Sequence, residues 1–366
     1  MRRYKNLTRL WLMLTAIPLV LVTLFNLFID PLWCFSHSNA LNNHQPGFNE
    51  RQQKTNRIFF NGLEGYDTLL LGSSRTAYID QHDFKGMRVF NYAADNMLPH
   101  EYEEWIDIAT KIKGTPFKNI IIGIDFFATA ENYDSVISRF YGGKVPRTYF
   151  QAATKPLYRF KTLLSYDALK HSIESVRRTF HPTISDYDRK NVRHCNIVVT
   201  DATREHYIER DIKEYKEHLT VDYRYRSAWK TLLENLKRKY PHTRFILFTT
   251  PVSQPFFETF ILKADHLAEY TRWIKETVQA MGMLWHFMDL NSVTTNLKNF
   301  FDAHHLYTPA AGWIALRVSD TDAPGVPVDF GKRLTPENID EYLRHFTKEM
   351  AQTKMSSAKI RSHFTE

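Results

Sequence analysis

The stretch YDTLLLGSSRTAYID, residues 66–80, joins a continuous apolar run to a Gly-Ser-Ser-Arg turn. A short apolar run bounded by a glycine is typical of a parallel strand that is covered on both faces. Ser74 then lies just beyond the carboxyl end of the strand, which is where open α/β sheets bind their ligands. Two interpretations of Ser74 stay open at this point: it caps a helix, or it is a nucleophile.

Apolar runs of strand length recur along the chain, at residues 66–72, 87–93, 118–127, 243–251 and 284–290. Helical patterns separate several of them, at residues 100–113, 227–240 and 266–281. Strands that alternate with helices predict right-handed crossovers and a mainly parallel, five-stranded sheet in a three-layer α/β domain. Residues 128–225 depart from this rhythm, and we expect a largely helical insertion there that covers one side of the sheet.

The N-terminus predicts a membrane anchor. Residues Leu10 to Ile29 contain no charged side chain, and a helix of roughly 20 apolar residues is long enough to cross a bilayer. Four basic residues precede this run, and the next Lys or Arg is Arg51, so the remainder of the chain is expected outside the cytoplasm. The alternative is a cleaved signal peptide.

These features divide the chain into four predicted parts. Residues 1–30 form a cytoplasmic tip and transmembrane helix, and residues 31–60 form a polar, turn-rich linker. Residues 61–320 form the α/β domain with its insertion at about 128–225, and residues 321–366 form a C-terminal tail or helix.

Composition narrows the choice of partners. The 366 residues carry a net charge of +8, which suits an anionic membrane surface or a polyanionic glycan. The positive charge is scattered, and neither zinc-finger spacing nor an RNA-binding aromatic signature is present, so nucleic-acid binding is not expected. Cys34 and Cys195 allow one disulfide at most, and a cysteine-rich metal site is excluded.

A second segment supplies partners for Ser74. In NFFDAHHLYTP, Asp302 stands three residues before His305, in the stretch where the loop after the last strand is expected. A serine becomes a nucleophile when an adjacent base takes its proton, and that base is commonly a His oriented by a carboxylate. Neighbouring His304 and His305 side chains diverge and lack a third ligand, so no metal site is predicted.

With these motifs the chain resembles the SGNH, or GDSL-like, hydrolase superfamily in its membrane-anchored bacterial branch. The resemblance covers most of residues 60–315 and is carried by LLLGSSR, VFNYAADN, IIIGIDFF and FFDAHH. It implies a flavodoxin-like fold in which Ser74 is the nucleophile, His305 its general base and Asp302 the residue that orients His305. Related proteins support O-acetylation of envelope polysaccharides and D-alanylation of teichoic acids.

Two blocks depart from the family pattern. The second block normally supplies a Gly to the oxyanion hole, and here it reads Ala93, Ala94, Asp95, Asn96. The third block normally supplies an Asn, and Asp125 stands in its place, where an ionised carboxylate would repel an oxyanion. The candidates for contacts to the oxyanion or the substrate are therefore Asn91, Asp95, Asn96, Asp125 and Arg75.

Two classes of function follow. The first is acyl transfer or ester hydrolysis through a Ser74 acyl-enzyme, without a cofactor, on an envelope glycan or a lipid-linked acceptor. The second is a non-catalytic scaffold or glycan-binding subunit in the bacterial cytoplasmic (inner) membrane, which retains the fold to recruit glycan or a membrane acyltransferase. The changed second and third blocks favour the scaffold, and the Ser74, Asp302 and His305 set favours the enzyme.

Overall fold

The structure is a computed structural model that describes residues 2–220, 223–321 and 325–363. The chain forms two compact units. Unit 1 comprises Met1–Leu63, Lys111–Lys113 and Val145–Ile197, and unit 2 comprises Glu64–Thr110, Gly114–Lys144 and Val198–Glu366. The expected insertion is thus divided, because its middle portion joins the N-terminal segment and its two ends belong to unit 2.

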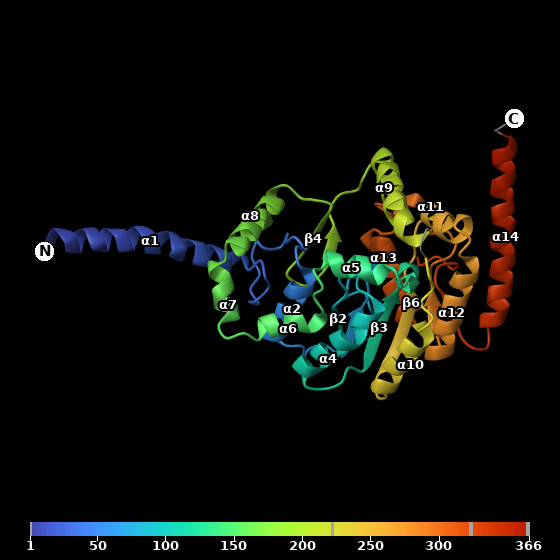
Figure 1. The fold of residues 1–366 in the computed structure, drawn as a ribbon, viewed down its shortest axis with the longest axis horizontal. Coiled ribbons are helices and arrows are strands. Elements are labelled where there is room, and N and C mark those ends of the chain that lie inside the picture. Colours follow the sequence, from blue (N-terminus) through green and yellow to red (C-terminus); the bar gives the residue numbers. More distant parts are fainter. Residues whose placement is uncertain (1, 221–222, 322–324, 364–366) are drawn as a thin grey trace. The chain divides into compact units, whose positions relative to one another are not determined.

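Unit 2 contains a six-stranded, mostly parallel sheet with the strand order β2-β1-β3-β6-β7-β8 (Figure 1). The strands are β1 (Thr68–Leu71), β2 (Val89–Asn91), β3 (Asn119–Ile124), β6 (Arg244–Thr249), β7 (Leu284–His286) and β8 (Lys332–Leu334). Each of the five apolar runs contains one strand, and these five pair in parallel. The sixth strand, β8, pairs antiparallel with β7 and was not predicted, because its sequence KRL has no apolar run.

The core of unit 2 explains why the runs are continuously apolar. Leu69, Leu70 and Leu71 are all wholly buried, so both faces of β1 are covered. In the register of the sheet, Leu70 lies opposite Ile121 of β3. Both side chains belong to a cluster that includes residues of α13 (Thr308–Val318), so this helix covers one face of the sheet.

Each of the three helical patterns of unit 2 corresponds to a helix in the structure, and the unit contains further helices besides. The three that were expected are α4 (Tyr102–Lys113), α10 (Trp229–Lys239) and α12 (Leu267–Met281). Trp229 and Thr277 join α10 to α12 through a hydrogen bond of 2.9 Å from Nε1 to Oγ1. The others are α3 (Ser74–Ala77), α5 (Tyr133–Phe140), α9 (Asp201–Leu219), α11 (Gln254–Phe257) and α14 (Ile339–His363).

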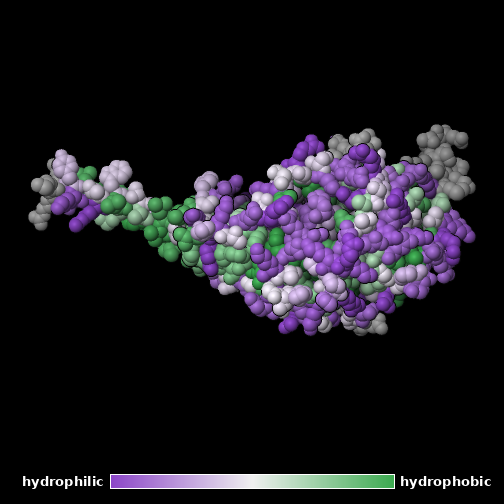
Figure 2. Space-filling model, turned by 60° about the horizontal axis from the view of Figure 1, so that its bottom comes forward, coloured by the Kyte–Doolittle hydropathy of each residue, from purple (hydrophilic) through white to green (hydrophobic). Residues whose placement is uncertain are grey.

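Unit 1 begins with one long helix, α1 (Arg2–Ile29). Within it, Tyr4–Ile29 is long and apolar enough to cross a membrane. Figure 2 shows hydrophobic residues along much of α1 and hydrophilic residues at its N-terminal tip. The other elements are α2 (Glu50–Asn61), α6 (Pro146–Ala153), α7 (Tyr158–Lys161), the 3-10 turn η3 (Thr162–Leu164), α8 (Tyr166–Phe180) and the hairpin strands β4 (Ser185–Tyr187) and β5 (Arg193–Cys195).

The segment expected to be a linker is largely ordered inside unit 1. The side chain of Asn49 caps α2 by accepting from the N–H of Gln52, and residues 50–56 of the helix are all buried. Gln53 donates to the carbonyl oxygens of Pro31 and Pro46 at 3.0 and 3.1 Å. The prediction of a linker was therefore wrong for this segment, because its polar side chains are buried and form their hydrogen bonds inside the unit. Cys34 and Cys195 are not joined by a disulfide.

Candidate active site

The turn after β1 places two serines in different environments. Ser73 is the N-cap of α3, and its Oγ accepts from the N–H of Arg75 at 3.3 Å. Gly72 has φ of 145°, and a Cβ there would lie 2.3 Å from Oγ1 of Thr76 and 2.8 Å from the carbonyl oxygen of Gly123. The glycine therefore permits the tight turn from strand to helix. Because Ser73 provides the cap, the Oγ of Ser74 is available for another contact.

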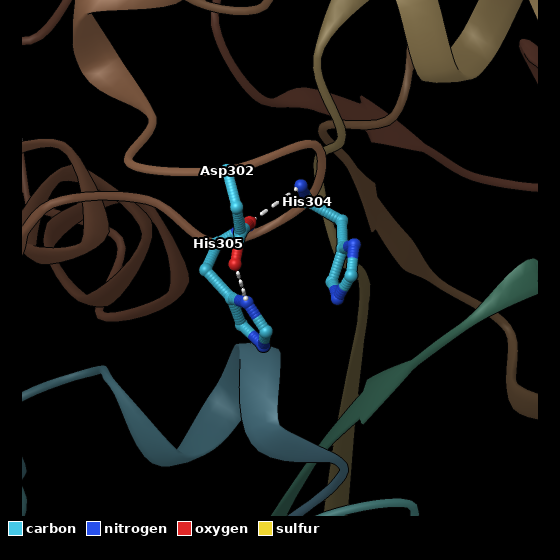
Figure 3. Close-up of side chains that lie close together, drawn as sticks. All are labelled: Asp302, His304 and His305. Atoms are coloured by element: carbon cyan, nitrogen blue, oxygen red, sulfur yellow. Dashed lines mark hydrogen bonds and ion pairs between the residues drawn. The ribbon is translucent and has the colours of Figure 1, made fainter. Parts of the chain in front are cut away.

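That contact is His305. Nε2 of His305 lies 2.8 Å from Oγ of Ser74, and Nδ1 of the same ring lies 2.7 Å from Oδ2 of Asp302. Figure 3 shows the His305 ring extending from the Asp302 carboxylate toward the short helix below it. With Nδ1 protonated and bonded to the carboxylate, Nε2 is the acceptor for the serine hydroxyl. The structure thus brings together the three residues that sequence reasoning assigned to catalysis.

The loop that carries His305 is held by its own carboxylate and by unit 2. Oδ1 of Asp302 accepts the backbone N–H groups of His304 at 2.9 Å and His305 at 2.8 Å, and Figure 3 shows the first of these bonds. Ser253 donates to the carbonyl oxygen of Ala303 through both its N–H and its Oγ, at 3.0 and 2.7 Å. Asp302 therefore uses one oxygen to shape the loop and the other to orient the imidazole.

The charges around this loop favour an ionised Asp302. Burial alone would raise its pKa, but the charges of His305 and His304 and the hydrogen bonds from these residues hold the pKa of Asp302 well below its usual range. Burial, and then the neighbouring His305, lower the pKa of His304 well below its ordinary value. Burial and the Asp302 charge raise the pKa of Asp211. The site thus combines a carboxylate that stays ionised with a buried, neutral imidazole beside it.

Aromatic rings restrict the motion of His305. The ring of Phe301 stacks on it with a centroid separation of 5.3 Å and an interplanar angle of 6°. The ring of Tyr78 lies at 5.3 Å and is tilted by 59°. Both rings come from segments next to catalytic candidates, and together they limit the imidazole to the plane that points at Ser74.

Asp125 is not an exposed carboxylate facing the site. It follows β3 and is wholly buried, and its Oδ1 accepts from Nη1 of Arg75 at 3.0 Å and from Oγ1 of Thr250 at 2.5 Å. The guanidinium of Arg75 also lies over the rings of Phe127 and Phe256. The expected repulsion of an oxyanion is therefore reduced, because a buried cation pairs with the carboxylate.

The amide candidate after β2 is structural. Nδ2 of Asn91 donates to the carbonyl oxygens of Thr76 and Ile79 at 3.2 and 3.0 Å, and thereby ties α3 to β2. Its Oδ1 accepts the N–H of Ala93 at 3.1 Å. Asn91 is thus an anchor for the turn that carries Ser74.

Asp95 and Asn96 lie in the loop after β2, and both are half-buried. The carbonyl oxygen of Asp95 accepts from the hydroxyl of Tyr141 at 2.7 Å. Asn96 has φ of 52°, a left-handed conformation that Asn tolerates better than most residues. The N–H of the preceding Ala94 donates to the carbonyl oxygen of Gly72 at 3.1 Å, so this loop is attached directly to the end of β1.

Asp302, His304 and His305 could also offer three metal-ligand atoms, which lie within 4.8 Å of one another. The separation of 2.7 Å between Asp302 Oδ2 and His305 Nδ1 is that of a hydrogen bond, however, in which a protonated Nδ1 donates to the carboxylate and so has no lone pair left for a metal ion. The arrangement therefore suits proton transfer from Ser74 better than coordination of an ion.

Sequence reasoning missed three supports of the site. Asp211 of α9 accepts the N–H of Ala303 at 3.3 Å, Ser253 holds the same residue, and Thr250 shares Asp125 with Arg75. Thr250 and Ser253 follow β6 in the stretch TTPVS. Their position after the carboxyl end of a predicted strand could have identified them as residues near the site. Asp211 lies inside the insertion, where no local pattern distinguishes it from other acidic residues of a charged helix.

Comparisons with known proteins identify no family. No family model matches the chain, and no curated protein matches it. One solved structure, described as "a putative platelet activating factor" from Streptococcus pneumonia, aligns with 73% of this chain and 90% of its own, at 11% identity and a TM-score of 0.36. A similarity of this size does not establish a shared fold.

Proposed function

We propose that unit 2 is a serine esterase or acyltransferase of the SGNH type. The observation that carries this proposal is the continuous pair of hydrogen bonds from Ser74 Oγ to His305 Nε2 at 2.8 Å and from His305 Nδ1 to Asp302 Oδ2 at 2.7 Å. The order β2-β1-β3-β6-β7 of the parallel strands supports a flavodoxin-like fold, in which ligands bind beyond the strand ends. Ser74 stands directly after one of those ends.

The reaction uses the three side chains in sequence. Oγ of Ser74 attacks the ester carbonyl carbon while its proton passes to Nε2 of His305, and Asp302 stabilises the imidazolium that forms. The tetrahedral intermediate collapses when His305 returns the proton to the leaving alkoxide, which departs as an alcohol and leaves acyl-Ser74. Water or an acceptor hydroxyl then gives its proton to His305 and attacks the acyl carbon, and His305 returns that proton to Oγ of Ser74 as the acyl–oxygen bond breaks.

The substrate class follows from the anchor. The helix α1 is long and apolar enough to cross a membrane, and we propose that it crosses the inner membrane of a bacterium with its basic N-terminus in the cytoplasm and unit 2 outside. Esters within reach of such a domain are those of envelope polysaccharides and of lipid-linked carriers. We propose an acyl group on one of these as the donor or the product, with a membrane acyltransferase as the partner if the acyl group comes from inside.

A scaffold is the second candidate, and one observation favours it. The N–H groups of Ala93 and Ala94 and the amide of Asn91 are bonded within the chain, and Asp125 is paired with Arg75. These groups are not presented as oxyanion donors, and a missing donor costs roughly a hundred- to a thousandfold in rate. As a scaffold, unit 2 would bind an acylated glycan at the same strand ends without cleaving it.

The decisive experiment compares two adjacent serines. We expect Ser74→Ala to abolish labelling by a fluorophosphonate probe and to remove hydrolysis of short-chain p-nitrophenyl esters, while the melting temperature changes little. Ser73→Ala is the matched control: losing the N-cap should cost about 1 kcal/mol of stability, and labelling should persist.

The outcomes separate the two candidates. If the unmodified protein does not react with the probe or with any ester, and Ser74→Ala retains full function in cells, the enzyme proposal is wrong and the scaffold stands. If Ser73→Ala and Ser74→Ala lose labelling equally, the effect comes from the turn rather than from the nucleophile.

A further inference from the structure

Helix α8 of unit 1 exposes large apolar side chains. Tyr166, Ile173 and Phe180 have exposed fractions of 77%, 55% and 66%. They are spaced by seven residues, so at 3.6 residues per turn they form a single stripe along the helix. Isolated exposed apolar residues are ordinary, but three large ones aligned on one side of a helix indicate an interaction surface.

The buried face of the same helix carries small and partly polar side chains, in contrast to the large apolar ones on its exposed side. Its buried residues are Ala168, Ser172 and Ser175, which are small, and two of them are polar. Oγ of Ser172 donates to Oδ1 of Asn26 of α1 at 2.8 Å. Small residues at a helix contact joined by a buried polar hydrogen bond are typical of helices that pack within a membrane, where apolar side chains face lipid.

The contact with Asn26 fixes the depth of α8. Asn26 lies within the last turn of the apolar helix, and its Nδ2 donates to the carbonyl oxygen of Leu163 in η3 at 2.9 Å. Since roughly 20 helical residues span the hydrocarbon, a span that starts near Leu10 ends near Ile29. Figure 1 shows α7 and α8 beside this end of α1. Both helices therefore lie at the level of the lipid headgroups.

The neighbouring side chains match that environment. Leu157, Phe160 and Leu164, from the α7 and η3 segment, have exposed fractions of 66%, 56% and 58%. On α8 the exposed cations Lys170 and Arg177 lie three residues before Ile173 and Phe180, on the same side of the helix, where their stems can follow the apolar side chains and their charges can reach phosphate groups. Arg177 also pairs with Glu174 at 3.0 Å. An apolar face flanked by cations is the pattern of helices that lie in a membrane interface.

We propose that α8, together with the α7 and η3 segment, is an interfacial membrane-binding surface that rests in the headgroup layer at the C-terminal end of α1. This surface holds unit 1 against the bilayer, so that unit 1 is attached to the membrane by direct contact as well as by α1. A second copy of the chain is the competing occupant. Lipid is favoured because the buried face of α8 packs on the end of α1 through Ser172 and Asn26, and α1 is long and apolar enough to cross a bilayer.

Site-directed spin labelling in lipid nanodiscs tests the proposal. The full chain with Cys195→Ser receives Ile173→Cys or Phe180→Cys on the stripe, or Asp167→Cys as a matched control on the exposed polar side of the same helix. Cys34 is 1% exposed and remains unlabelled. Collisions of the nitroxide with oxygen, which partitions into lipid, are compared with collisions with a water-soluble nickel chelate.

We expect the oxygen-to-nickel collision ratio to be several-fold higher at positions 173 and 180 than at 167. Equal, water-like ratios at all three positions would overturn the proposal. Labels at 173 and 180 that are immobilised and shielded from both reagents would also overturn it, and would assign the stripe to a protein interface. The two stripe positions are independent, so failure of one variant to fold leaves the other as the test.

Discussion

The two units bury opposite kinds of side chain. In unit 2, the strands place Leu69, Leu70 and Leu71 wholly inside, as expected when burial of apolar surface drives folding. In unit 1, α2 buries seven consecutive polar residues, 50–56, while α8 turns its apolar stripe outward. The difference is what we expect if unit 2 has water on its outside and, as proposed above, unit 1 rests against lipid.

The polar interior of unit 1 is stable only because its groups are paired. Arg189 is buried, and its Nη2 lies 2.5 Å from Oδ2 of Asp30 and 2.7 Å from the carbonyl oxygen of Phe35. Asp30 also accepts the N–H of Cys34 at 2.8 Å. A buried polar group without a partner would cost more than the net gain from a bond, so this network specifies how the end of α1 joins the unit.

The largest expected effect concerns the site of unit 2. Asp302→Asn should lower kcat/KM for ester hydrolysis by up to about 10⁴-fold, because an amide at this position favours the wrong tautomer of His305. Asp211→Asn is the control from the same loop environment and should have a much smaller effect. A loss of less than tenfold in Asp302→Asn would show that the carboxylate only shapes the loop.

The next largest effect is a loss of stability when a buried ion pair of unit 1 is removed. Arg189→Met should destabilise the protein by about 3–5 kcal/mol, because it leaves the Asp30 carboxylate buried without its cation. Thermal unfolding in detergent measures this loss. The double variant Asp30→Asn with Arg189→Met should recover part of it, and a double variant that is no more stable than the single one would contradict this role for the pair.

A third comparison sets the two apolar surfaces against each other. Leu70→Ala in the core of unit 2 should cost about 2–5 kcal/mol, through lost burial and the cavity that remains. Ile173→Ser on the exposed stripe of unit 1 should change stability by less than about 0.5 kcal/mol in detergent. Both are measured as shifts in the unfolding midpoint. Equal losses would mean that the α8 stripe is buried against protein.

The smallest expected effect is a pH dependence from unit 2. His286 is wholly buried, and burial lowers its pKa to about 4. Because the unfolded His has an ordinary pKa of about 6.5, the unfolded state takes up the proton first. The stability associated with neutral His286 is therefore complete above about pH 6.5 and falls as the pH drops toward 4, by up to about 3 kcal/mol.

The check is unfolding at several pH values between 7.5 and 4.5. His304 has a lowered pKa as well, so the unmodified protein should lose stability through both groups. His286→Asn keeps an amide near the position of Nδ1, which bonds with Thr249, and should show a shallower pH dependence. An unchanged slope would mean that His286 does not supply this effect.

Local sequence was sufficient for the main elements of unit 2 and for the residues that form the candidate site. Continuous apolar runs found all five parallel strands, because a strand covered on both faces leaves no polar alternation. Ser74 and the Asp302–His305 pair were recognised because the ends of parallel strands share one edge of a sheet. The apolar helix at the N-terminus was recognised from its length and lack of charge.

Only the tertiary structure decided how these residues are used. Ser74 and His305 are 231 positions apart in the sequence, so the strand-end pattern could name both residues but not show that their side chains form a hydrogen bond while Ser73 caps the helix. Strand β8, the burial of α2 and the outward stripe of α8 were equally hidden. Each depends on a distant partner, such as Asn26 for α8, and the polarity of a short stretch of sequence does not show which distant groups will cover it or satisfy its hydrogen bonds.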